Sequence, residues 1–511
     1  MKLFITLVFT LSLVQIYAQE PADALRYGWT VPGGTARVRA IGGAMGSLGG
    51  DITATFINPA GIAFYKTGDF VLSPSYTFGK NNSSYLGRKE TDKWNGLNWG
   101  TTGFVIGSGS GRGKIKNSAF SLAYNRSADF NTNILYRGFN NQSSYSQKYL
   151  EEIQNNNIKD ANQVAGNFPF GTSLAFNTFY IDTIAGGSSN NFQFQTRAPI
   201  ATGLFQQNTI QAHGGIDEIA LAYAVNSNDK LYIGGSLGVP ILHFKRTSEF
   251  IEADTTSNQN NKFNFAQVTE NLSTKGVGIN LKIGLIYKIA DMWRVGLAIH
   301  SPTLYQLTDN TDVTLTTDTE GYQGVQTQSS GDVTGANAAF KYMLVTPYKV
   351  LGSISYVLRE VEDVTQQKGF ITADVEYINY KSASFKVDQN NNNDQATVDY
   401  LNSLDNAIKN AYKGAFNFRV GGELKFTTIM ARAGFSYYGN PYKNINGENG
   451  NRMNISGGLG YRNKGFFMDL TYVQQLNKDV NFAYRLQSAP YYGANIKTSA
   501  GSVYLTFGFK I

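Results

Sequence analysis

The chain has 511 residues, of which 42% are hydrophobic, 13% aromatic and only 16% charged, whereas soluble proteins usually carry about 25% charged residues. It contains 54 glycines and no cysteine, which excludes disulfide bonds and thiolate metal sites. The net charge of +7 comes from 44 basic and 37 acidic residues that are scattered along the chain, so we expect no nucleic-acid partner. Low charge with many aromatic residues and glycines is typical of a membrane β-barrel.

The first eighteen residues have the pattern of a secretory signal peptide. Lys2 provides the positive start, an apolar stretch runs from Leu3 to Ile16, and Ala18 is the small residue before a cleavage site. The apolar stretch is shorter than the about 20 residues that a membrane-spanning helix needs. We therefore expect residues 1–18 to be removed on export, and a membrane location would require a barrel.

Residues 19–68 lack the alternation of a strand and are rich in glycine and other small residues. Glycine lets backbone segments pack closely and turn sharply. The segment ends with Asn58, Pro59 and Ala60, where proline fixes φ and asparagine can bond neighbouring backbone groups. We expect this segment to lie inside a barrel as a plug, and the alternative is a periplasmic N-terminal extension.

From residue 69 to residue 511, apolar and polar residues alternate in segments of about ten residues, as in strands with one face toward lipid and the other toward the lumen. Phe416, Phe418 and Val420 share one face of such a segment, and Asn417 and Arg419 share the other. A helix, with its period of 3.6 residues, could not keep the two sets apart. About 14 segments of this kind begin near residues 69, 99, 117, 217, 230, 276, 291, 347, 369, 415, 428, 452, 464 and 501.

The connections between these segments are alternately long and short. Short periplasmic turns and long outer loops produce this alternation in outer-membrane barrels, whereas a soluble β-sandwich has no reason to place every long loop at one end. Two long connections contain amphipathic patterns that predict helices over residues 145–154 and 401–412. The fold class predicted is all-β, a transmembrane antiparallel β-barrel of about 14 strands with an N-terminal plug in its lumen.

Three motifs of the N-terminal segment resemble the plug of the FadL/TodX outer-membrane transport family, in the form common in Bacteroidetes: Gly33 to Arg37, Gly42 to Ala44 and Asn58 to Ala63. The similarity continues through residues 231–246, 276–303, 347–380 and 504–511. The resemblance implies a monomeric barrel that passes long-chain fatty acids or other hydrophobic compounds by diffusion, through a ligand pocket and a lateral opening at a kink in the third strand.

Family motifs can be carried onto this chain at two places. The plug motif falls on Asn58, Pro59 and Ala60. The strand kink falls near Asn125, Arg126 and Ser127, although members of the family often have an aromatic residue followed by glycine there. This departure puts the lateral opening in question.

We expect the ligand pocket to be formed by the apolar plug residues, with two arginines available for an anionic head: Phe56, Ile57, Ile62, Phe64, Arg37 and Arg39. The partners implied by the resemblance are a hydrophobic small molecule and the lipid and lipopolysaccharide of a Gram-negative outer membrane. No cofactor is implied.

Other motifs do not develop into a site. Gly234 to Gly238 matches the G-x-S-x-G string, but the alternation around it predicts a strand rather than the strand-to-helix turn that a nucleophile needs. Residues 107–114 lack the spacing of a phosphate loop, and residues 388–399 lack the turn glycine of a calcium loop. We expect neither enzymatic activity nor a metal site.

Uptake of hydrophobic small molecules is the function that the sequence favours. A general porin, a non-transporting scaffold or partner subunit of an outer-membrane complex, and an outer-membrane lipase remain as alternatives. The lipase is the weakest of these, because the sequence places no serine and histidine together.

Overall fold

The structure is a computed structural model of the chain, and it describes residues 21–31, 33–109, 113–184, 192–256, 258–335, 338–358, 368–388, 395–443 and 450–510. The expected signal peptide lies outside these residues. Within the described ranges, no helix combines the length and apolarity needed to cross a membrane.

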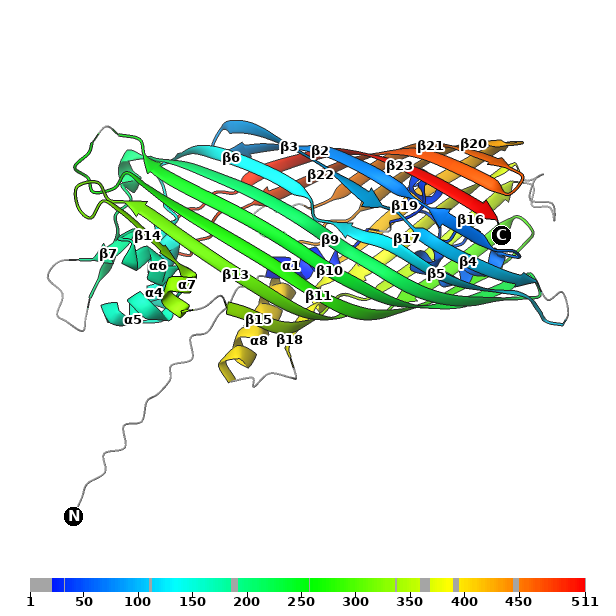
Figure 1. Ribbon diagram of the computed structural model, residues 1–511, viewed down its shortest axis with the longest axis horizontal. Coiled ribbons are helices and arrows are strands. Elements are labelled where there is room, and N and C mark those ends of the chain that lie inside the picture. The colour runs from blue at the N-terminus through cyan, green and yellow to red at the C-terminus, as the bar shows by residue number, and fades with distance from the viewer. Residues whose placement is uncertain are drawn as a thin grey trace, which may run out of the picture.

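The described strands form a closed antiparallel barrel of fourteen strands, as predicted (Figure 1). The first three strands are each interrupted, and they consist of β1 (Asp69–Leu72) with β2 (Pro74–Tyr85), β3 (Arg88–Trp99) with β4 (Thr102–Gly109), and β5 (Ile115–Asp129) with β6 (Thr132–Asn140). The fourth to sixth strands are β9 (Leu204–Ser227), β10 (Leu231–Asp254) and β11 (Phe265–Lys288). The last strand pairs with the first, with Asp69 opposite Lys510, and this pairing closes the ring.

The remaining strands complete the ring in chain order. The seventh to ninth are β12 (Trp293–His300) with β13 (Leu304–Asp318), β15 (Ala338–Val345) with β16 (Lys349–Leu358), and β17 (Gly369–Asn379) with β18 (Ser384–Val387). The last five are β19 (Gly414–Phe426), β20 (Ile429–Tyr438), β21 (Arg452–Asn463), β22 (Phe466–Asn481) and β23 (Ala494–Lys510).

Short helices occupy the N-terminal segment and the long connections. The N-terminal segment contains α1 (Pro21–Gly28), α2 (Ala36–Ala40), α3 (Ala54–Ile57) and η1 (Pro59–Phe64). The connection from β6 to β9 contains α4 (Ser146–Asn155), α5 (Ala161–Asn167), α6 (Thr172–Asn177), β7 (Ile181–Thr183), β8 (Phe194–Thr196) and η2 (Ile200–Thr202). Later connections contain β14 (Val325–Ser329), α7 (Ser330–Thr334), η4 (Tyr380–Ser382) and α8 (Gln395–Ala411). Helices α4 and α8 confirm the two helices predicted from amphipathic patterns.

The long connections among the described residues lie at one end of the barrel, the loop end, together with the tight turn at Leu86 and Gly87 that joins β2 to β3 (Figure 1). The other tight turns lie at the opposite end, the turn end. Asn228 and Asp229, which join β9 to β10, have φ values of 55° and 53°. Two positive φ values give a turn whose twist matches that of the flanking strands.

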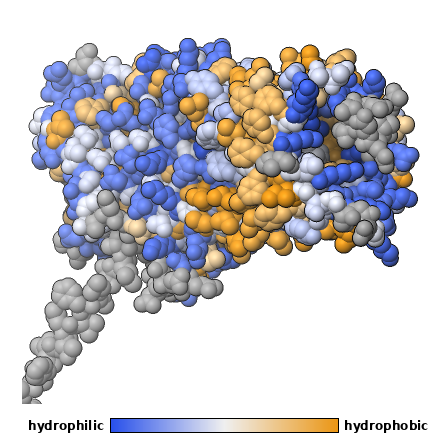
Figure 2. All heavy atoms as spheres, turned by 45° about the vertical axis from the view of Figure 1, so that its right-hand side comes forward, coloured by the Kyte–Doolittle hydropathy of each residue, from blue (hydrophilic) through white to orange (hydrophobic). Residues whose placement is uncertain are grey.

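An apolar belt surrounds the barrel. In β19, Phe416, Phe418 and Val420 are exposed on the outside, while Asn417 and Arg419 are buried in the lumen. Figure 2 shows the belt as a hydrophobic band between two hydrophilic zones. Exposed apolar side chains on this scale are stable only against an apolar medium, so the belt is the part of the wall that faces lipid.

Candidate functional site

The N-terminal segment lies inside the barrel and fills its turn-end half. Most residues from 34 to 63 are buried, and α2 packs against β20, β21, β22 and β23. The wall approaches the segment so closely that a Cβ built on several barrel glycines would overlap its atoms: Gly234, Gly284, Gly296, Gly421 and Gly434. These glycines, on five different strands, let the plug backbone lie directly against the wall.

Asn58 links two parts of the plug to the wall. Its Nδ2 donates to the carbonyl oxygens of Gly46 at 2.6 Å and Leu285 at 3.2 Å, and its Oδ1 accepts from the backbone N–H of Ala60 at 3.2 Å. The last bond caps η1, whose first residue is Pro59, a residue suited to that position because its φ is already helical. The Asn-Pro-Ala motif is therefore the point where the plug turns and attaches to β11.

Buried charged side chains provide further attachments. Asp374 on β17 accepts from the backbone N–H groups of Met45 at 3.1 Å and Gly46 at 3.2 Å. Arg294 on β12 donates to the carbonyl oxygen of Leu48 at 2.9 Å. Arg419 is fully buried and lies 3.9 Å from Asp374. Bonds to charged groups are stronger than neutral ones, so the plug is held firmly.

The expected pocket residues of the plug do not come together at one place. Phe56 and Ile57 line a small cavity of about 80 Å³, and Arg39 lines a separate, larger cavity. Ile62 and Phe64 line neither cavity, and Phe64 instead stacks on Tyr232 with ring centroids 4.0 Å apart.

Arg37 also lies away from both cavities. It donates to the carbonyl oxygen of Gly50 at 2.9 Å and lies 3.4 Å from Glu423. Its guanidinium is therefore engaged in holding the plug to the wall. Of the two arginines expected to meet an anionic head, only Arg39 faces the larger cavity.

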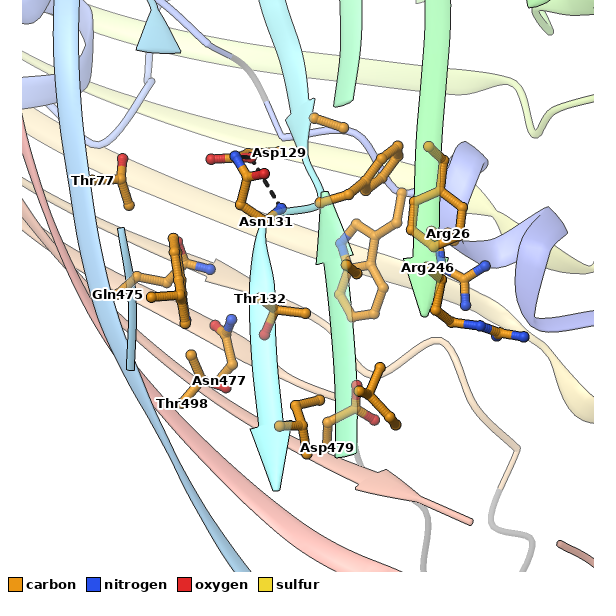
Figure 3. A pocket seen from close by; sticks show the side chains of 18 of the residues that line it. Arg26, Thr77, Asp129, Asn131, Thr132, Arg246, Gln475, Asn477, Asp479 and Thr498 are labelled. Atoms are coloured by element: carbon orange, nitrogen blue, oxygen red, sulfur yellow. Dashed lines mark hydrogen bonds between the residues drawn. The ribbon is translucent and has the colours of Figure 1, made fainter. Parts of the chain in front are cut away.

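The larger cavity, of about 530 Å³, lies between the plug and the loop end. This volume is within the range of about 300–1,000 Å³ typical of small-molecule sites. One side is lined by residues of the plug and the first three strands, including Trp29, Arg39, Trp94 and Trp99. The other strands contribute amide, hydroxyl, charged and apolar side chains, many of which point into the open space in Figure 3.

The barrel wall is interrupted beside this cavity. Among the described strands, β4 pairs with β5, but β3 pairs only with β2, and β6 pairs only with β9. The buried, inward-facing Asn81 and Ser83 of β2 donate to the backbone carbonyl oxygens of Asn133, at 2.6 Å, and Leu135 in β6. Strand β6 therefore lies on the inner side of the β2–β3 hairpin, and we call the unpaired junction of β3 and β6 the seam.

The predicted kink segment lies at the end of the seam that is nearer the turn end of the barrel. The pairing of β5 with β9 shifts between Arg126 and Ala128, so Ser127 is an extra residue that bends the strand. Arg126 donates to Asp217 at 3.2 Å and to the carbonyl oxygen of Gly214 at 2.6 Å. The strand stops after Asp129, before β6 begins.

Side chains rather than backbone bonds connect the two edges of the seam. Asn98 donates to Asp129 at 2.6 Å, and Asn133 donates to the carbonyl oxygen of Lys93 at 3.0 Å. Trp99 lines the cavity and is nevertheless 48% exposed. The cavity therefore extends to the seam. Asn98 and Trp99 were not predicted from the sequence, in which the nearest signal is Gly100, between β3 and β4.

A cap formed by the connection from β6 to β9 covers the loop end, and its attachment centres on Glu252. This fully buried carboxylate accepts from Tyr180 Oη at 2.5 Å, Gln206 Nε2 at 2.9 Å and the backbone N–H of Tyr145 at 3.2 Å. Burial raises the pKa of Glu252 above its ordinary value, although these hydrogen bonds oppose the shift. Tyr145 also lines the larger cavity, so the cap forms part of its roof.

No protein-family model and no curated protein matches the sequence. Among solved structures, the chain resembles the crystal structure of a Pseudomonas aeruginosa FadL homologue, with a TM-score of 0.55 and 13% identity over 94% of this chain and 99% of that chain. It also resembles the deltaS2 mutant of the TodX monoaromatic hydrocarbon channel, with a TM-score of 0.50 and 11% identity over 95% of this chain and 99% of that chain. These likenesses confirm, at the level of the fold, the resemblance inferred from the sequence.

Proposed function

We propose that this protein is an outer-membrane channel of a Gram-negative bacterium that takes up hydrophobic small molecules and releases them sideways through the seam. The observation that carries the proposal is the cavity of about 530 Å³ that extends to Trp99, at an interruption of the wall. A lateral exit delivers an apolar molecule into lipid without passage through water, which favours cargo with a large apolar surface.

The plug argues against a general porin. Its backbone lies against the wall glycines, and Asp374 and Arg294 bond to it directly. A water-filled path through the barrel would require these buried bonds to break, which is unfavourable because the charged groups would lose their partners.

Several finer points belong to the same proposal. The fold neighbours are named as a FadL homologue and a monoaromatic hydrocarbon channel, which supports long-chain fatty acids or aromatic compounds as cargo. Residues 1–18 would direct export. The plug would be held by Asn58, Pro59 and Ala60. The end of the exit nearer the turn end would be shaped by Asn125, Arg126 and Ser127. The barrel would act as a monomer among lipid and lipopolysaccharide.

A reversible cross-link across the seam tests the proposal. The chain has no cysteine, so replacing Asn98 and Asp129 with cysteine gives two unique thiols at positions whose side chains are 2.6 Å apart. The control pair replaces Glu249 and Gln267, whose side chains are 2.9 Å apart across the continuous ladder of β10 and β11. Uptake of radiolabelled oleate is measured in a Gram-negative host that lacks its own fatty-acid uptake.

We expect a bifunctional thiol reagent to reduce oleate uptake to background in cells with the seam pair, and a reducing agent to restore it. The control pair should keep full uptake after the same treatment. Full uptake with a completely cross-linked seam would refute the lateral exit. Background uptake by the unmodified protein with oleate, and likewise with toluene, would refute the uptake of fatty acids and of aromatic compounds.

A further inference from the structure

The larger cavity has two walls of different chemistry. Neighbouring strands β21, β22, β23 and β2 present amide and hydroxyl groups to it: Asn454, Gln475, Asn477, Thr498, Ser502 and Thr77. These positions are adjacent across the sheet, since Asn454 pairs with Gln475, Asn477 with Thr498, and Ser502 with Thr77. Strands β9, β10 and β11 present a mixed wall, which carries the apolar residues of the cavity together with four polar or charged ones: Ile210, Ala212, Phe244, Phe250 and Val268, and Asn208, Arg246, Ser248 and Glu270.

Figure 3 shows the polar wall through its labelled members Thr77, Gln475, Asn477 and Thr498, whose side chains gather on one side of the open space. Arg246, from the facing strands, lies across it. A cavity in which one wall is polar and the facing wall carries apolar side chains among polar ones fits an amphipathic molecule better than a hydrocarbon. A hydrocarbon would remove water from the amides without replacing their hydrogen bonds, which is unfavourable.

Several polar atoms of this cavity have no hydrogen-bond partner among the described residues. Asn454 is only 6% exposed, and its Oδ1 is unpaired. The Oδ1 of Asn477 and the indole N–H of Trp29, also 6% exposed, are unpaired as well. Buried polar groups in folded proteins nearly always have partners, so this group points to a ligand that both donates to the amide oxygens and accepts from the indole.

The charged groups of the cavity are largely satisfied by the protein itself. Arg126 pairs with Asp217 at 3.2 Å, and Arg246 pairs with Glu270. The guanidinium of Arg452 lies 3.7 Å from the ring centroid of Trp29. A carboxylate head could only accept hydrogen bonds and would leave the amide oxygens unpaired, whereas hydroxyl groups both donate and accept.

We infer that the cargo is an amphiphile with a neutral head rich in hydroxyl groups, of the alkyl glycoside class. The head lies against Asn454, Gln475 and Asn477, and the alkyl chain lies against the apolar side chains that β9, β10 and β11 present. This inference rests on the proposed function and narrows its substrate class.

Binding of three probes with the same eight-carbon chain tests the inference: n-octyl β-D-glucoside, octanoate and 1-octanol. Each is titrated calorimetrically, below its critical micelle concentration, into the full chain in lipid nanodiscs. The variants are Asn454→Val and Asn477→Val, and the matched control is Asn463→Val, an exposed asparagine at the turn end of the same strand as Asn454.

We expect the glucoside to bind most tightly. Each cavity variant should weaken glucoside binding about fivefold, which corresponds to one lost hydrogen bond, and leave octanol binding unchanged. The control variant should bind all three probes as the original protein does. The order of affinities in the original protein remains informative even if a variant fails to fold.

Tightest binding of octanoate would overturn the inference in favour of an anionic head, and equal binding of all three probes would overturn it in favour of a purely apolar cargo. Both results would leave the proposed uptake of hydrophobic molecules standing. Absence of binding by every probe, together with background uptake of oleate, would refute the proposed function as well.

Discussion

Replacing Gly284 with alanine should loosen the plug from the barrel wall. A Cβ at this position of β11 would overlap the Oδ1 of Asn58 and lie 3.0 Å from Cδ of Pro59. Asn58 is fully buried, and its amide bonds to the carbonyl oxygens of Gly46 and Leu285. The side chain therefore cannot move aside without breaking these bonds.

The magnitude follows from the bonds at risk. A buried polar group left without its partner costs about 1–3 kcal/mol, and an extra methyl group in a packed site costs about 1–3 kcal/mol. Of the two Asn58 bonds that are disturbed, the one to Leu285 at 3.2 Å joins the plug to the wall, and the one to Gly46 at 2.6 Å holds the plug in the shape that docks. We therefore expect a loss of about 3 kcal/mol of plug docking, which raises the population of undocked plug about 150-fold.

Single-channel recording in planar lipid bilayers measures this population as the fraction of time in a conducting state. Hydrogen exchange at the backbone N–H of Ala60, which donates to Asn58, reports on the same motif independently. The matched control is Gly352→Ala in β16, where an added Cβ meets no atom within 4 Å. If Gly284→Ala matched the control in both measurements, close backbone packing would not be what holds the plug.

Three further predictions concern buried charges. Lys282→Met should destabilise the barrel by about 3 kcal/mol, because Glu218, whose side chain is 7% exposed, loses its ion-pair partner. The double variant with Glu218→Gln should recover most of that stability. The measurement is the temperature at which the barrel loses its compact mobility in gels. Burial raises the pKa of Glu252, so its contribution to cap stability is fully present below the ordinary glutamate pKa of about 4.3 and is lost as pH rises through the raised pKa. Protection of the cap from hydrogen exchange should therefore fall over this pH range. The Glu252→Gln variant should lack this fall in protection. Glu151 should show the opposite sign. Burial opposes the shift, but hydrogen bonds from Ser488 and Gln487 lower the pKa of Glu151, so its contribution to cap stability is present above the ordinary pKa and is lost as pH falls through the lowered pKa. Protection factors of the cap with the same pH dependence in the Glu151→Gln variant and the original protein would contradict this.

The number and order of the strands could be predicted because lipid requires apolar and polar residues to alternate along each strand of the wall. The ends of the strands could not be predicted where this alternation stops. The fourth strand was expected to begin near residue 217, but β9 begins at Leu204, and β3 begins at Arg88 rather than near residue 99. These extensions project beyond the apolar belt, where side chains such as Lys89 and Lys93 face water and no alternation is required.

Fewer residues of the site than of the fold could be predicted from the sequence. Asn58 was singled out by its motif, whereas Phe64 was expected in the ligand pocket and packs on Tyr232 near the turn end. The amides Asn454 and Asn477 occupy alternate positions of ordinary lumen-facing strands, so nothing in the sequence separates them from other inward polar residues. Only the closure of the ring brings strands from opposite ends of the chain around one cavity.

Two routes lead out of the cavity, and their energetics differ. Movement through the barrel would require the plug to leave its glycine contacts and to break its bonds to Asp374, to Arg294 and to the carbonyl oxygen of Leu285, each worth about 1–3 kcal/mol. Opening of the seam would break the exposed bonds of Asn98 and Asn133, whose groups water can satisfy at little cost, and the ion pair of Arg137 with Glu90. Movement of β6 away from the hairpin would also break the bonds that Asn81 and Ser83 donate to β6. The sideways route leaves the plug in place, and along it a cargo with an alkyl chain gains stabilisation because that chain enters lipid as it leaves.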